Sequence, residues 1–228
     1  MSLTIVIPAL EAATSLPGTL AAIAEAGPEV GIVVVDGGSR DGTAEVAAEL
    51  GARVIVAPSG RGTQLAAGVA EAASAWVLLL HADTQLESGW HEAAASFMAE
   101  PCPSERGHNE RAGYFRFALD SADPRARRLE RLVAWRCRRF GLPYGDQGLL
   151  IRRTTLEAAG GIRPLPLMED VDLVRRLRGR LVPLAPRAVT SAARWEAEGW
   201  YRRSARNLSC LGLWYAGVPP RVLARLYG

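Results

Sequence analysis

The stretch WVLLLHADTQL, residues 76–86, joins five apolar residues directly to a histidine and an aspartate. A short apolar run bounded by polar residues is typical of a buried β-strand. The strand therefore ends where His81 and Asp83, two side chains that bind metals and protons, follow one another. Two interpretations are open at this point: an ordinary strand end with a polar turn, or a metal-and-phosphate site at the carboxyl edge of a sheet.

Strands alternate with helices around this stretch. Apolar runs predict the strands, and apolar residues at helical spacing predict the helices between them. The expected strands are 3–8, 31–36, 53–57 and 76–81, and the expected helices are 11–26, 41–51, 62–74 and 88–99. Continuously apolar strands in such an alternation predict an α/β fold, a mostly parallel sheet with helices on both faces. Ligands bind these sheets beyond the carboxyl ends of the strands.

The second half of the chain is less regular. Residues 101–111 are polar and contain proline, which indicates a loop. A strand is expected at 114–119, and a loop that enters a strand at 144–153. Helical patterns occupy 125–139, 154–159, 168–178 and, with interruptions, the tail from about residue 198. We therefore expect a C-terminal helical extension on the α/β domain.

The composition bounds the class of protein. Apolar residues make up 49% of the 228 residues and charged residues 22%, which fits a folded domain with a sizeable core. No apolar run approaches the roughly 18 residues that a spanning helix needs, and the N-terminus does not resemble a signal peptide. The three cysteines lie far apart, without the spacing of a zinc site or a disulfide framework. These features predict a cytoplasmic protein.

Charge is divided unevenly along the chain. Residues 1–100 contain three Arg and twelve Asp and Glu, whereas residues 101–228 contain twenty-four Arg and twelve acids. The chain contains no Lys, which excludes Schiff-base and P-loop lysine chemistry. The basic residues crowd the helix expected at 125–139. This helix is either a solvated amphipathic helix or a patch for an anionic acceptor or membrane surface.

Polar motifs follow several expected strands. The first strand ends in Pro8 and Ala9 rather than in the glycine motif of dinucleotide-binding folds. Asp36 ends the second strand, where it either stabilises a turn or accepts hydrogen bonds from a ribose or base. A glycine-rich loop containing Arg61 opens a helix and suits a phosphate. His81 stands where haloacid-dehalogenase-type hydrolases need a nucleophilic aspartate, so that class is disfavoured.

Together these segments resemble the family 2 glycosyltransferases. The resemblance covers about residues 3–195 and consists of the order and spacing of IVIPAL, VVDGGSRDGT, GRGTQLAAG, LLHADT, YGDQ and MEDVDL. The family's members are inverting enzymes of the GT-A (Rossmann-like) fold that use nucleotide-diphospho sugars. HADT, YGDQ and MED are most similar to a small subgroup of soluble bacterial members. That subgroup is labelled as associated with radical-SAM genes or arsenosugar biosynthesis.

The resemblance implies a nucleotide-sugar site in residues 1–100. Pro8 and Ala9 correspond to the segment that lines the nucleoside pocket, and Asp36 to the acid that hydrogen-bonds the base, usually uracil. Arg61 corresponds to the loop near the nucleotide, and Ala82 falls in the same site. Asp83 corresponds to the metal-binding acid of the family's DxD motif, for Mg²⁺ or Mn²⁺. His81 replaces the motif's first aspartate and is the second candidate metal ligand.

The resemblance also implies an acceptor-binding half and a general base. Asp170 corresponds to the family's proposed base, with Glu169 beside it. Residues 101–228 would bind the acceptor, a small molecule or a lipid-linked one, within one integrated domain. The alternative is a non-catalytic nucleotide- or glycan-binding module on the same fold. Nucleic acid is disfavoured because acidic strand ends repel phosphate, while a peripheral membrane contact and a homodimer stay open.

Overall fold

The computed structural model describes residues 2–27, 29–100, 111–177 and 179–227. The loop expected at 101–111 lies outside the described residues except for Arg111, and Cys102 lies outside them as well. Among the described residues, Cys137 and Cys210 are free and buried. No helix in this part of the chain is both long and apolar enough to cross a membrane.

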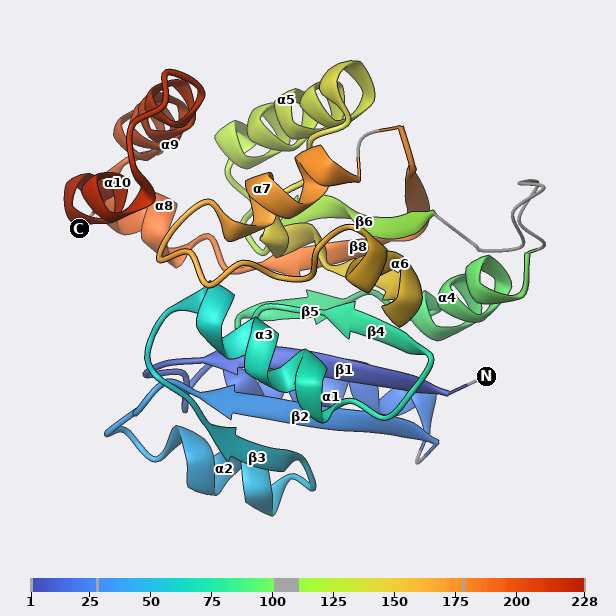
Figure 1. Cartoon of the computed structure of the whole chain (residues 1–228). Helices are drawn as coiled ribbons and strands as arrows, with labels where there is room; N and C mark the ends of the chain where they lie inside the picture. Colours follow the sequence, from blue (N-terminus) through green and yellow to red (C-terminus); the bar gives the residue numbers. More distant parts are fainter. Residues whose placement is uncertain (1, 28, 101–110, 178, 228) are drawn as a thin grey trace.

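The strands of the described residues form one eight-stranded mixed sheet in the order β3-β2-β1-β4-β7-β6-β8-β5 (Figure 1). Their bounds are β1 Leu3–Ala9, β2 Val30–Asp36, β3 Arg53–Val56, β4 Trp76–Leu79, β5 Thr84–Leu86, β6 Ala112–Leu119, β7 Leu149–Arg152 and β8 Leu181–Thr190. The first four strands in this order are parallel, as the alternation in the sequence predicts. Strand β7 then runs antiparallel to both β4 and β6. The predicted α/β class is confirmed.

Strands β5 and β8 were not predicted from the sequence. Strand β8 contains Pro183 and Pro186, which lack a backbone N–H and count against a strand. It pairs in parallel with β6 across a register shift between Tyr114 and Arg116, next to the prolines. Irregular pairing of this kind tolerates proline. Strand β5 is only three residues long and pairs antiparallel with β8.

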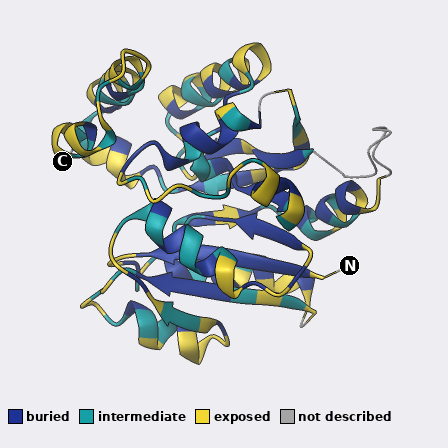
Figure 2. Cartoon of the chain, in the orientation of Figure 1, coloured by how far each residue is buried: buried dark blue, intermediate teal, exposed yellow. Residues whose placement is uncertain are grey.

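Helices cover both faces of the sheet. On one face lie α1 (Leu16–Ile23), α2 (Thr43–Glu49) and α4 (Trp90–Ala99), whose buried side chains share a core with alternate residues of β1, β2 and β4. On the other face lie α3 (Arg61–Glu71), α6 (Arg153–Ala158) and α7 (Glu169–Arg176). Strands β1 and β4 are buried from both sides (Figure 2), which explains their continuously apolar sequences, whereas the edge strand β3 is partly exposed.

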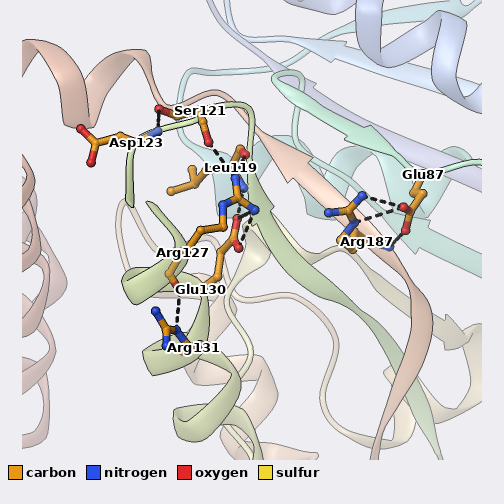
Figure 3. A network of polar contacts seen from close by, with 8 residues as sticks. All are labelled: Glu87, Leu119, Ser121, Asp123, Arg127, Glu130, Arg131 and Arg187. Atoms are coloured by element: carbon orange, nitrogen blue, oxygen red, sulfur yellow. Dashed lines mark hydrogen bonds and ion pairs between the residues drawn. The ribbon is translucent and has the colours of Figure 1, made fainter. Parts of the chain in front are cut away.

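The remaining helices pack beside β6 and β8. They are α5 (Pro124–Phe140), α8 (Ala193–Glu198), α9 (Trp200–Tyr215) and α10 (Pro220–Tyr227), with short 3₁₀ turns η1 at Ala24–Ala26 and η2 at Gly145–Gln147. The predicted C-terminal helical extension is present. Polar contacts tie the start of α5 to the end of β6 (Figure 3). Arg127 donates to the carbonyl oxygens of Leu119 and Ser121, and Glu130 accepts from the Leu119 N–H at 2.9 Å.

Candidate active site

The loops after β1 and β2 are joined at the carboxyl edge of the sheet. The Gly37 N–H donates to the Ala9 carbonyl oxygen at 2.8 Å, and the Ala12 N–H donates to Thr43 Oγ1 at 2.8 Å. Glu11 has a φ of 50° and accepts from the Arg40 N–H at 2.8 Å. Such a φ costs a non-glycine residue energy, and strained residues of this kind cluster at functional sites.

A buried glutamine that sequence reasoning missed holds these two strand ends together. Gln64, only 2% exposed, donates from Nε2 to the carbonyl oxygens of Ala9 and Val35, both at 2.8 Å. Ala9 is the last residue of β1 and Val35 the last but one of β2, so this amide joins the carboxyl ends of two neighbouring strands. A polar residue on the inner face of an otherwise apolar helix, here α3, was the available signal.

The residues assigned to the nucleoside pocket lie at this same edge. Asp36 is 4% exposed and accepts from the backbone N–H groups of Gly38 at 2.9 Å and Ser39 at 3.0 Å. Its carboxylate therefore shapes the turn after β2, which was the structural interpretation of this residue. Pro8 and Ala9 are buried, and the carbonyl of Ala82 accepts from Thr19 Oγ1 at 3.0 Å. None of the four lines the main cavity, so the structure leaves their role in nucleotide binding as a prediction.

A cavity of about 950 Å³ opens beside this edge. Several predicted site residues line it together: Arg61, His81, Asp83 and Asp170. They come from the start of α3, the segment after β4 and the start of α7, so residues distant in the sequence meet in one place. Asp146 from η2 joins them, together with Ser191 and Arg194 from the segment after β8.

Glu169 does not line the main cavity and is ion-paired with Arg61. The Nε atom of Arg61 lies 2.9 Å from Glu169 Oε1, and the glutamate side chain is only 1% exposed. Burial, followed by the neighbouring charge of Asp170, raises the pKa of Glu169 to about 7, against the opposing effect of Arg61. The preceding residue, Met168, has a φ of 66°, so backbone strain occurs at this part of the site as well.

Asp170 faces the cavity and is fixed by the turn η2. Its Oδ2 atom accepts from the Gly145 N–H at 2.8 Å. A Cβ atom on Gly145 would lie 2.6 Å from His81 Nε2 and 3.3 Å from Asp170 Oδ2, so only glycine fits there. Burial, and then the charge of Arg61, lower the pKa of His81 to about 4. His81 is therefore neutral at pH 7 and can act as a ligand or as a hydrogen-bonding group.

Asp146 is a second site residue without a predicted role. The motif YGDQ contributes only to the family resemblance, yet its aspartate lines the cavity with Asp83 and Asp170. Its Oδ1 atom is buried and has no hydrogen-bond partner among the described residues. Burial raises the pKa of Asp146 to about 6; Asp170 and Asp83 also raise it, whereas Arg136 lowers it. A buried carboxyl oxygen without a hydrogen-bond donor destabilises the folded protein unless a bound ligand supplies that donor.

The donor atoms of the site suit a hard cation. Among the described residues, no group of three or more His, Cys, Asp or Glu is arranged to hold a metal by itself. Asp83 and His81 therefore offer a partial set, which oxygen atoms of a bound ligand would have to complete. Mg²⁺ is typically held in this way, by one or two carboxylates together with substrate phosphates. Carboxylates, an arginine held by an ion pair and a neutral histidine thus meet at the edge of an α/β sheet where ligands bind in such folds.

Comparison with known proteins shows the family to which the chain belongs. The family model described as Glycosyl transferase family 2 matches residues 4–120, just over half of the chain, so the chain belongs to this family. It is 43% identical over 89 residues to uncharacterized glycosyltransferases of Mycobacterium bovis and Mycobacterium tuberculosis. The matched part is 39% of this chain and 39% of each relative's length.

Solved structures share the fold. S. aureus TarS superposes with a TM-score of 0.63 at 14% identity, over 84% of this chain and 61% of that one. Glucosyl-3-phosphoglycerate synthase from Mycobacterium tuberculosis, in complex with Mn²⁺, UDP and glucosyl-3-phosphoglycerate, superposes with a TM-score of 0.53 at 18% identity. The match covers 83% of this chain and 70% of that one. Mannosyl-3-phosphoglycerate synthase from Rubrobacter xylanophilus superposes with a TM-score of 0.53 at 20% identity, over 84% of this chain and 66% of that one. The GT-A fold expected from the sequence is confirmed.

Proposed function

We propose that this protein is an inverting glycosyltransferase that moves a sugar from a nucleotide-diphospho donor, a UDP-sugar, to an acceptor hydroxyl. The observation that carries the proposal is the meeting of Asp83, Asp170 and Arg61 in one cavity at the carboxyl edge of the sheet. Family membership supports sugar transfer. The UDP-GlcNAc bound to TarS and the UDP-glucose bound to glucosyl-3-phosphoglycerate synthase support a UDP-sugar donor.

In this proposal Asp170 is the general base. It accepts the proton of the acceptor hydroxyl while the acceptor oxygen forms a bond to the anomeric carbon. The bond from that carbon to the diphosphate oxygen breaks on the opposite face, and the electron pair leaves with the nucleoside diphosphate. Of the two neighbouring acids, Asp170 lines the main cavity, whereas Glu169 is ion-paired with Arg61. Glu169 therefore serves to position Arg61 near the leaving group.

Asp83, with His81, would hold Mg²⁺ or Mn²⁺. A divalent cation supplies charge that stabilises a leaving diphosphate. The Mn²⁺ in the complex of glucosyl-3-phosphoglycerate synthase supports such an ion here. Asp36, Pro8, Ala9 and Ala82 would bind the nucleoside, and residues 101–228 would bind the acceptor. The similarity of HADT, YGDQ and MED to the radical-SAM-associated subgroup supports placing the protein there.

The test is turnover of UDP-glucose and UDP-GlcNAc with MnCl₂. Wild-type protein should hydrolyse its donor slowly without acceptor, and early NMR spectra should show the released sugar with inverted anomeric configuration. Asp170→Asn should lower turnover about 10²- to 10⁴-fold, the usual contribution of a general base, with UDP binding nearly unchanged. Glu49→Gln, which changes an exposed acid on α2, is the matched control. Donor binding without any hydrolysis by the wild type would instead favour the non-catalytic binding module.

A further inference from the structure

The cavity at the active site has a second, apolar end. Beyond the carboxylates it extends between α5 and α9, which lie on the same side of the sheet in Figure 1. Its apolar lining includes Leu132, Trp135 and Phe140 from α5, Leu167 from the segment before α7, and Leu208 and Leu211 from α9. We call this end the apolar groove. It is continuous with the polar end that contains Asp170.

The fold buries only part of the groove's apolar lining: Leu167 and Leu211 belong to a core cluster, whereas the other side chains are left exposed. Helix α5 packs on β6 through Ala126, Val133 and Cys137, which are buried. On the same helix Leu132 is 62% exposed and Trp135 54% exposed, and Leu208 on α9 is 64% exposed. Large apolar side chains gathered in a concave surface mark a binding site, because leaving them in water is unfavourable.

Three arginines line the same cavity as the apolar groove and the carboxylates: Arg136, Arg175 and Arg194. The guanidinium of Arg136 lies 3.4 Å from the ring centre of Tyr144, and that of Arg175 lies 4.8 Å from the ring centre of Tyr215. Within the described residues none of the three forms an ion pair with a carboxylate, whereas Arg127, Arg203 and Arg206 nearby do. Arg136 donates to the Leu142 carbonyl oxygen at 2.9 Å and its charge acts on Asp146. Arg175 and Arg194 are exposed, so their positive charge is available for an anionic ligand.

We propose that the acceptor is a lipid with an anionic, hydroxyl-bearing head group, whose apolar chain lies in the apolar groove. This rests on the proposed function, because Asp170 takes its proton from the head-group hydroxyl. The arginines then balance the charge of the head group, while Leu132, Trp135 and Leu208 contact the chain. A second protein chain over the groove would have to place its own carboxylates opposite these arginines, whereas an anionic head group brings the counter-charge itself. Charge complementarity thus favours the lipid.

A chain-length series tests this inference directly. The probes are monoacyl phosphatidylglycerols with hexanoyl, octanoyl and decanoyl chains, below their micellar concentrations, and glycerophosphoglycerol as the head group alone. Binding to the full chain is followed by tryptophan fluorescence, since Trp135 and Trp195 line the cavity. We expect the Kd to fall at least threefold for each pair of added methylenes; complete burial would give about fifteenfold. A Kd that does not change with chain length would overturn the inference.

A pair of variants on one helix locates the binding. Leu208→Glu should raise the Kd of the decanoyl probe at least tenfold, because it places a charge in the apolar groove. Leu213→Glu is the matched control: Leu213 is also exposed on α9, at 37%, but does not line the cavity. Circular dichroism checks that both variants fold. Equal weakening by both would indicate adsorption to the helix surface and would overturn the inference.

Two further measurements distinguish a failure of the lipid-acceptor proposal from a failure of the proposed transferase activity. A dimer that dissociates in Leu208→Glu and binds no lipid would show a second copy in the groove and overturn the lipid acceptor. Hydrolysis of UDP-sugar by wild-type protein without lipid tests the donor chemistry alone. Hydrolysis without chain-length dependence contradicts only the lipid acceptor. Chain-length dependence without hydrolysis contradicts only the transferase activity and supports the groove as a lipid site.

Discussion

The loops that follow β1 and β2 are tied together by short hydrogen bonds, whereas α5 and α9 line an open groove. At the first edge Gln64 links two strand ends, and Thr43 accepts from the next loop. In the groove Leu132 and Leu208 are each more than 60% exposed. Both regions border the same site, yet the loops of the first are joined by hydrogen bonds, whereas the groove leaves large apolar side chains exposed.

This difference indicates a division of roles. A pre-organised edge loses little conformational entropy on binding, which suits a ligand that every turnover requires, such as a nucleotide donor. An open apolar surface is covered only when its ligand binds, so its shape and polarity select which acceptor binds. The uneven distribution of charge along the sequence agrees with this division of roles. The strand ends of residues 1–100 carry acids, and the helices of residues 101–228 carry arginines.

The two regions meet at a few residues. Arg61 from the first half pairs with Glu169 from the second, and His81 from the first half lies against Gly145. The candidate catalytic residues therefore belong to neither half alone. Substitutions in the donor half and at the junction of the two halves should therefore affect different properties: nucleotide binding, turnover or stability.

The largest effect is expected on the donor side. Asp83→Ala should weaken UDP binding in the presence of Mn²⁺ at least about 100-fold, because the change removes the carboxylate expected to hold the metal. Without metal, or with EDTA, wild type and variant should bind UDP equally. Calorimetry with and without MnCl₂ measures both, with Glu49→Ala as control. Tight metal-dependent binding by Asp83→Ala would show that another residue holds the ion.

A change at the junction should have an intermediate effect. Gly145→Ala introduces a Cβ that would clash with His81 and press on Asp170, so turnover should fall about 100-fold through misplacement of catalytic groups. Gly212→Ala on α9 is the control, because its Cβ meets nothing within 4 Å. That variant should keep its activity and gain about 0.5–1 kcal/mol of stability. Equal activity of the two variants would contradict the proposed contact between η2 and the site.

The smallest effect is a pH dependence of stability that arises at Glu169. Its folded pKa, about 7, lies above the ordinary 4.5. The stability contributed by its protonated form is fully present below about pH 4.5 and is lost as the pH rises to about 7. Urea unfolding from pH 4.5 to 7.5 should show this decrease in the free energy of unfolding for the wild type. The decrease should be smaller for Glu169→Gln. An identical pH profile for both would show that Glu169 is ionised throughout.

Local patterns predicted most elements but not how they pair. Strands β1 and β4 are predicted because they are buried from both faces and read as continuous apolar runs, and the apolar sequences of β2 and of the exposed edge strand β3 predict these strands as well. Strand β8 was missed because Pro183 and Pro186 contradict the local pattern, and only pairing with β6 and β5 holds it in the sheet. Asp146 was given no role because its environment depends on residues far away in the chain.

The sequence by itself determined the α/β class, the family resemblance and the identity of the acids at the strand ends, because these depend on short-range periodicity and motif order. Tertiary structure alone decided which of those groups meet. Asp83, Asp146 and Asp170 share a cavity because β7 lies between β4 and β6 and brings η2 beside the segment after β4. The apolar groove likewise exists only because α5 and α9, about sixty residues apart in the chain, pack on the same side of the sheet. Contacts at such separations follow from strand order and helix packing, which no local pattern encodes.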